Sequence, residues 1–168
     1  MSSSLDTLSK LGEKPPREIS DPSLKADMLA MNEMMRNTSD DYILNMQEKN
    51  NSKRIVTTLK LYSNLAYVLH FVKPSLICAV SLRMVELKMA HGLIHSSPGA
   101  FALYGGVLVA AGNIIEGCRF GMYLSFLLCL HHRFTWLNHH FFFLFSMNFF
   151  VYRETSPEAR GEKRCVDA

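Results

Sequence analysis

The sequence has few cysteines and no recognisable catalytic motif. Its four cysteines, at positions 78, 118, 129 and 165, are separated by 40, 11 and 36 residues. The absence of a C-x-x-C pair argues against the common zinc motifs, and the cysteines are too sparse for a disulfide-stabilised secreted domain. We therefore expect Cys78, Cys118 and Cys129 to be small apolar core residues in a reducing compartment.

The sequence also lacks a strong excess of either charge. Lys and Arg number 18 and Asp and Glu number 15, which gives a net charge of +3 and an isoelectric point near 8.7. This balance is too mild to indicate a nucleic-acid partner. Lys49, Lys53, Arg54 and Lys60 form a mildly basic stretch without interleaved aromatics, so we expect a solvated helix face there and no nucleic acid.

The two ends of the chain are polar. The first residues lack the basic start and apolar stretch of a signal peptide, which favours a cytoplasmic protein. Residues 1–22, with Pro15-Pro16 and Asp21-Pro22, are predicted to be a flexible, disordered leader. Residues 153–168 are predicted to be a polar disordered tail.

Helical periodicity dominates residues 23–130, and no useful stretch alternates with the period of a strand. A helix is predicted from Ser23 to about Met35, and Thr38 or Ser39 is predicted to cap a second one. The clearest helix begins near Ser52, with one apolar face made by Ile55, Leu59, Tyr62, Ala66 and Leu69.

Proline and glycine divide the rest of this region into further helices. Lys73-Pro74 breaks the long helix, and the next one ends at His91, before Gly92. Ser96-Ser97-Pro98 opens another helix, which ends at Gly112-Asn113, and a last one runs from Ile114 towards Leu130. The predicted class is all-α, and the short connections predict antiparallel helical hairpins.

One stretch resembles a tetratricopeptide repeat unit. Leu65 and Phe101 are 36 residues apart, near the repeat's period of about 34 residues. The resemblance implies packing roles for six residues: Phe101, Tyr104, Gly105, Leu108, Gly112 and Gly117. Gly112 is expected to end one helix, and Gly117 to mark a close contact with the helix near Tyr104–Leu108. Gly121 and Leu124 depart from the repeat pattern, which prefers an aromatic residue and alanine there.

A longer resemblance covers roughly residues 30–123 and rests on several short runs. These are Met34-Met-Arg-Asn, Leu59-Lys-Leu-Tyr, His70-Phe-Val-Lys-Pro-Ser-Leu, Ala79-Val-Ser-Leu-Arg-Met-Val-Glu-Leu, and Gly105-Gly-Val-Leu through Asn113-Ile-Ile-Glu-Gly-Cys-Arg. They resemble the helical region of very large predicted AAA-type ATPases and serine/threonine kinases of diatoms and other microbial eukaryotes. The resemblance implies a fragment of a tetratricopeptide-like array, without the catalytic module.

The catalytic signatures of that family are missing here. The chain has no G-x-x-x-x-G-K-[ST] run and no H-R-D or D-F-G signature, so we expect neither an enzyme nor a cofactor. Arg83 with Glu86, and Glu116 with Arg119, are each three residues apart, and we interpret them as structural ion pairs between stacked helices. The expected function is a non-catalytic interaction or scaffold segment that binds an unidentified protein or peptide.

The apolar segment 131–152 fits the helical pattern poorly and supports an alternative. His131-His132 and His139-His140 do not combine into one metal site, because adjacent side chains point in different directions. Phe134–Tyr152 carries no formal charge over 19 residues, close to the length that spans a bilayer as a helix. The alternatives are therefore a small membrane-associated protein anchored by this segment, an apolar tail packed on the array, or sequence outside the family's frame.

Overall fold

The computed structural model describes residues 2–46, 52–92 and 98–121, and within these ranges every regular element is a helix. This confirms the all-α class. The helices are α1 (Ser2–Lys10), α2 (Pro22–Arg36), α3 (Asp40–Leu44), α4 (Lys53–Val72), the 3-10 turn η1 (Pro74–Leu76), α5 (Ile77–His91), α6 (Pro98–Ala110) and a further helix at residues 114–121.

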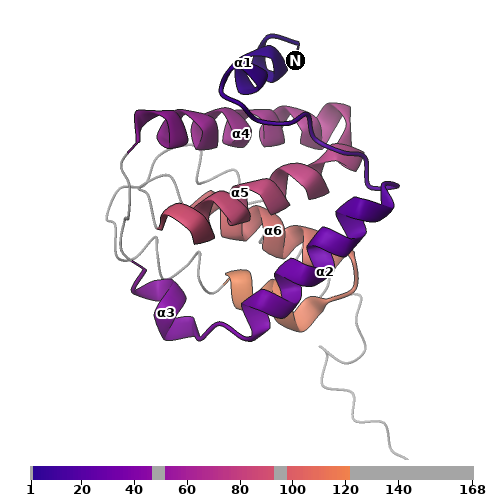
Figure 1. The fold of residues 1–168 in the computed structure, drawn as a ribbon. Helices are drawn as coiled ribbons and strands as arrows, with labels where there is room; N and C mark the ends of the chain where they lie inside the picture. Colours follow the sequence, from indigo (N-terminus) through magenta and orange to yellow (C-terminus); the bar gives the residue numbers. More distant parts are fainter. Residues whose placement is uncertain (1, 47–51, 93–97, 122–168) are drawn as a thin grey trace, which may run out of the picture.

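The central helix of the described fold is α5. It packs against α4 on one side and α6 on the other, and α2 also contacts it. Ten of its fifteen residues are buried, which explains why its sequence has no clear polar face. In Figure 1, α4, α5 and α6 follow one another as neighbouring layers, while α1 lies on the outer side of α4.

The chain reverses between α4 and α5 because the helix cannot continue through Lys73. This residue precedes Pro74 and takes φ −151° and ψ 72°, well outside the helical region. Pro74 then begins η1, which leads directly into α5. The break predicted from the sequence is confirmed, and it sets α5 back alongside α4 (Figure 1).

Two further predicted helix ends are found, at Ser39 and Gly92, while α2 begins one residue before the predicted Ser23, with Asp21 as its cap. Ser39 caps α3 by accepting a hydrogen bond from the Tyr42 N–H at 3.2 Å. Asp21 caps α2 by accepting one from the Ser23 N–H at 2.8 Å. Gly92 follows α5 with φ +85°, a conformation that favours glycine.

Two groups of buried side chains form the core. One joins α1, α4 and α5, and includes the predicted face Leu59, Tyr62, Ala66 and Leu69. The other joins α2, α5, α6 and the helix at 114–121, and it includes Leu24, Met31, Met35, Phe101, Tyr104, Leu108 and Phe120. Because α5 contributes to both groups, it connects the two halves of the described fold.

The structure corrects the prediction that residues 1–22 are a flexible leader. Residues 2–10 form α1, and Leu8 is only 2% exposed because it packs into the core beside α4. Residues 11–21, which we call the strap, have no regular structure of their own and run from α1 to α2 (Figure 1). The leader is ordered because Leu5 and Leu8 pack against α4 and because charged strap side chains bind the helices.

Several predictions fall outside the described residues. They concern the last helix beyond residue 121, the apolar segment 131–152 with its histidines, and the tail 153–168. Among the helices that the structure describes, none has both the length and the apolar character needed to cross a bilayer.

Candidate functional site: a charged cleft under the strap

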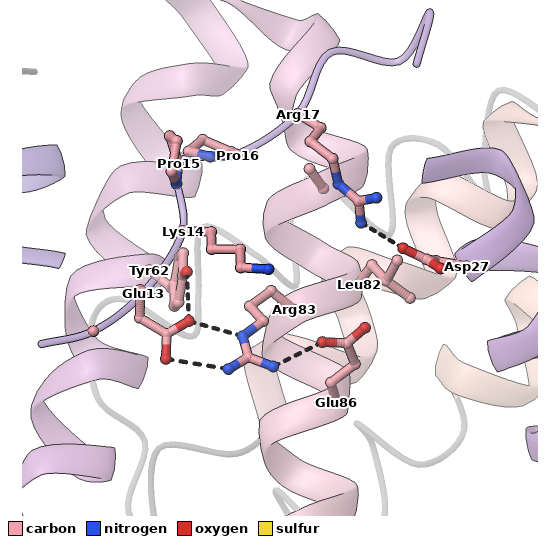
Figure 2. A pocket seen from close by; sticks show the side chains of 12 residues that line it. Glu13, Lys14, Pro15, Pro16, Arg17, Asp27, Tyr62, Leu82, Arg83 and Glu86 are labelled. Carbon is pink, nitrogen blue, oxygen red and sulfur yellow. Dashed lines mark hydrogen bonds and ion pairs between the residues drawn. The ribbon is translucent and has the colours of Figure 1, made fainter. Parts of the chain in front are cut away.

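A cleft of about 710 Å³ lies between the strap and the helices that it crosses. Strap residues 12–17 form one wall. The other walls come from Asp27 on α2, Tyr62 on α4, and Ala79, Leu82, Arg83 and Glu86 on α5. Figure 2 shows charged side chains from the strap, α2 and α5 directed into this space. The sequence alone did not reveal this site, because the strap was expected to be disordered.

Glu13 is the most buried charged group of the cleft, with a side chain only 8% exposed. Arg83 donates to both its carboxylate oxygens, from Nε at 2.8 Å and from Nη2 at 3.2 Å. The Tyr62 hydroxyl donates a third hydrogen bond at 3.0 Å. Burial by itself raises the pKa of Glu13, but the Arg83 hydrogen bonds and charge outweigh it, so the pKa lies below its usual value.

Arg83 bridges two carboxylates and thereby joins the strap to α5. Its Nη1 donates to Glu86 at 2.9 Å, so the ion pair predicted between these residues is present. The hydrogen bond to Glu13 raises the pKa of the guanidinium further above its usual value. Burial and the neighbouring Glu13 likewise raise the pKa of the Tyr62 hydroxyl, which keeps it protonated as a donor.

The other end of the strap is held in a similar manner at the start of α5. Glu18 accepts a hydrogen bond from the Ser75 hydroxyl at 2.6 Å and pairs with the Lys73 ammonium. The N–H of Ile19 donates to the Ser75 carbonyl at 3.2 Å. Lys73 and Ser75 together hold the pKa of Glu18 below its usual value.

Two arginines fasten the strap to its flanking helices. Arg17 donates to Asp27 on α2 at 2.6 Å and to the Ser23 hydroxyl at the same distance. Arg54 on α4 donates to the Leu11 carbonyl, so one residue of the predicted basic stretch binds the strap. These contacts fix both ends of the cleft's outer wall.

Lys14 is different from the other cleft cations. Figure 2 shows its side chain lying across the cleft between the strap and α5, apart from the ion pairs. Among the residues that the structure describes, its ammonium has no ion-pair or hydrogen-bond partner, whereas Arg17 and Arg83 are both paired with carboxylates. The cleft therefore presents one cation that is available to an anionic ligand.

The arrangement suits recognition better than acid–base chemistry. The three carboxylates that line the cleft, on Glu13, Asp27 and Glu86, are each paired with a guanidinium group. No serine, cysteine or histidine is among the residues that line it. Within the described ranges, no three potential metal ligands of the His, Cys, Asp and Glu types gather together.

The aromatic residues singled out by the repeat pattern lie in the core, away from the cleft lining. Phe101, Tyr104 and Leu108 are buried on α6, and Phe120 packs against the two rings. The Tyr104 hydroxyl donates to Asn32 Oδ1 at 2.8 Å, which joins α6 to α2.

The glycines of the repeat pattern lie where helices meet or end. Gly112 follows α6 with φ +86°, in the left-handed region. A Cβ atom placed on Gly117 would lie 2.8 Å from the Gly105 carbonyl oxygen and 2.5 Å from Val109 Cγ2. The helix at 114–121 therefore approaches α6 too closely for a side chain at this position.

The second predicted ion pair belongs to another part of the fold. Arg119 and Glu116 approach to 3.5 Å, and Arg119 also binds Asp40 at 2.5 Å and the carbonyls of Met35 and Thr38. Arg36 donates to Glu116 at 3.3 Å. These contacts fasten the helix at 114–121 to the link between α2 and α3.

The cysteines that the structure describes are free thiols. Cys78 is buried and Cys118 is half-buried, and burial raises the pKa of both. Their positions fit the packing role predicted for them, while Cys129 and Cys165 lie outside the described residues.

Comparison of the chain with models of known protein families, with characterised proteins and with solved structures finds no match.

Proposed function

We propose that the chain is a non-catalytic protein-interaction segment that binds an extended peptide in the cleft between the strap and α5. The observation that supports this proposal is the unpaired ammonium of Lys14 inside a cleft whose other charges are paired. A peptide that carries an aspartate or glutamate side chain would supply the missing anion. The cleft volume falls within the usual range of ligand pockets, about 300–1,000 Å³, and suits a short peptide segment.

The helical architecture belongs to the same proposal. Successive helices α4, α5 and α6 pack on one another, and the close contact of Gly117 with α6 supports the proposal of a tetratricopeptide-like hairpin. The resemblance of residues 30–123 to the helical region of large microbial ATPases and kinases leads us to propose that this is a piece of such an array. Finding ATPase or kinase motifs in frame beside the coding sequence would support it, and their absence would argue against it.

Panning a displayed library of short random peptides on the full chain tests the binding proposal. We expect enrichment of peptides with acidic side chains, because an ammonium group without a partner forms a charge-assisted hydrogen bond with a carboxylate. Lys14→Gln should weaken their binding severalfold. Lys10→Gln, which removes a charge on α1 away from the cleft lining, is the matched control and should leave binding unchanged. No enrichment, or equal losses in both variants, would contradict the proposal.

The alternative function, membrane association, is supported by the 19 uncharged residues of Phe134–Tyr152. It is tested by fractionating cells that express the chain with and without residues 126–168. Flotation of the full chain with membranes, combined with loss of flotation in the shortened form, would favour the alternative. Similar fractionation of both forms would count against it.

A further inference from the structure

The hairpin of α4, η1 and α5 holds the strap through two receptors of the same chemistry. Each receptor combines one cationic side chain with one hydroxyl group, and each binds one strap glutamate: Arg83 and Tyr62 hold Glu13, while Lys73 and Ser75 hold Glu18. The two glutamates are five residues apart in the sequence. The helices thus recognise a spaced pair of carboxylates.

Between these anchors, the strap is held as a bound peptide would be. The backbone hydrogen bonds that the structure gives near it lie at its ends, from the N–H of Glu13 to the Leu8 carbonyl and from the N–H of Ile19 to the Ser75 carbonyl. Pro15 and Pro16 have no N–H to donate, and their fixed φ angles favour an extended chain. Side-chain charge, not a backbone ladder, therefore positions the strap.

We infer that this hairpin is a receptor for an extended peptide with two carboxylates five residues apart, and that the strap occupies it in cis. The inference rests on the proposed peptide-binding function and identifies the chemistry of the partner. An incoming acidic peptide exchanges its own carboxylates for those of Glu13 and Glu18. The strap glutamates then leave Arg83 and Lys73, while the Arg17–Asp27 pair and the hydrogen bond from Arg54 to the Leu11 carbonyl keep the strap, with its Lys14, beside the bound peptide.

The receptors are accessible enough for this exchange. The side chains of Arg83 and Lys73 are 43% and 47% exposed, so an incoming carboxylate reaches both cations from solvent. The strap competes well with a free peptide, because its covalent connection gives it an effective concentration at the hairpin on the order of millimolar. Only molecules whose strap glutamates have left Arg83 and Lys73 can bind a free peptide. The apparent affinity for that peptide therefore falls as the fraction of molecules with a bound strap rises.

A synthetic peptide with the sequence of residues 11–21 is the probe that tests the inference. It is titrated into the full chain and into the double variant Glu13→Gln/Glu18→Gln, whose strap lacks both carboxylates. We expect the variant to bind the peptide about tenfold more tightly or better, because its strap competes less. The control peptide, in which both glutamates are replaced by glutamine, should bind neither protein.

Hydrogen exchange of the wild-type chain provides a second measurement that does not depend on the folding of a variant. Saturating peptide should speed exchange of the strap amides and leave those of α6 unchanged. Unchanged strap exchange, or equal affinity of the wild type and the variant for the peptide, would overturn the inference. Equal binding of the glutamate and glutamine peptides would also overturn it. The proposed function is judged separately, by whether the peptide library yields ligands that depend on Lys14.

Discussion

Arg83 and Glu13 are seventy positions apart in the sequence and form a two-point ion pair across the cleft. Arg83 Nε and Nη2 lie 2.8 and 3.2 Å from the two carboxylate oxygens of Glu13. This geometry is stronger and more directional than a single surface contact. It couples the least regular part of the described chain to its most buried helix, α5.

Removal of this arginine is the sharpest test of how the strap is held. Arg83→Gln leaves the Glu13 carboxylate largely buried with only the Tyr62 hydroxyl as a donor, so we expect the unfolding free energy to fall by about 1–3 kcal/mol. Arg36→Gln is the matched control: Arg36 is 60% exposed, and Arg119 still lies 3.5 Å from Glu116 after the change, so we expect a loss of about 1 kcal/mol or less. Urea unfolding of the full chain measures both, and equal effects would contradict the assigned role of Arg83.

Stability should depend on pH through the strap glutamates. The pKa values of Glu13 and Glu18 are lower in the folded chain than in the unfolded chain, where the pKa of glutamate is about 4.3. Their contribution is therefore complete above the unfolded value and is lost as the pH falls through the lower folded values. Urea midpoints should fall as the solution is acidified below about pH 5.

The double variant Glu13→Gln/Glu18→Gln supplies the control for this pH dependence. It should lose less stability on acidification than the wild type, because two of the titrating groups are gone. Asp21, whose pKa is lowered mainly by hydrogen bonds from Ser23, stays in place and leaves a residual slope. Parallel pH profiles of the two proteins would show that the strap glutamates are not responsible.

The helices were predictable because their signals are local. The break at Lys73-Pro74, the cap at Ser39 and the terminating Gly92 each act within a turn of the helix end that they define. The apolar face of α4, from Leu59 to Leu69, is likewise a pattern within a single helix. These local signals were sufficient to predict the all-α class from the sequence.

The cleft was not predictable because its contacts join distant parts of the sequence. Strap residues such as Glu13 and Glu18 are surrounded by lysine, arginine and proline, a composition typical of disorder. Only the spacing of Leu5 and Leu8 indicates that the leader packs on a helix. The spacing of three residues predicted the ion pair of Arg83 with Glu86. No pattern in the sequence indicated that Arg83 also pairs with Glu13.

The contact between Tyr104 and Asn32 should contribute measurably to the docking of α2 on α6. Tyr104→Phe removes the hydroxyl that donates at 2.8 Å to Asn32 Oδ1, and we expect a loss of about 0.5–1.5 kcal/mol in unfolding free energy. Tyr42→Phe is the control, since Tyr42 is half exposed on α3 and should change stability little. If the two variants unfold alike, the hydrogen bond from Tyr104 does not stabilise the fold.

Gly117 should tolerate no side chain, not even the methyl group of alanine. The repeat pattern alone predicts that Gly117→Ala is accepted, because such repeats often carry alanine there. The structure corrects this, since the new Cβ would lie 2.8 Å from the Gly105 carbonyl oxygen, and a backbone atom cannot rotate away. We expect Gly117→Ala to cost about 1–3 kcal/mol, and Gly117→Leu to cost more.

Gly106 offers a matched control one residue beyond this contact. It also lies within a helix, but a Cβ atom there meets nothing within 4 Å. Gly106→Ala should therefore leave stability unchanged or raise it by up to about 1 kcal/mol, because alanine has the higher helix propensity. Thermal unfolding of the two alanine variants separates helix propensity from steric contact. A Gly117→Ala protein as stable as the wild type would show that the helix at 114–121 does not lie so close to α6, and it would remove that support for the tetratricopeptide-like hairpin.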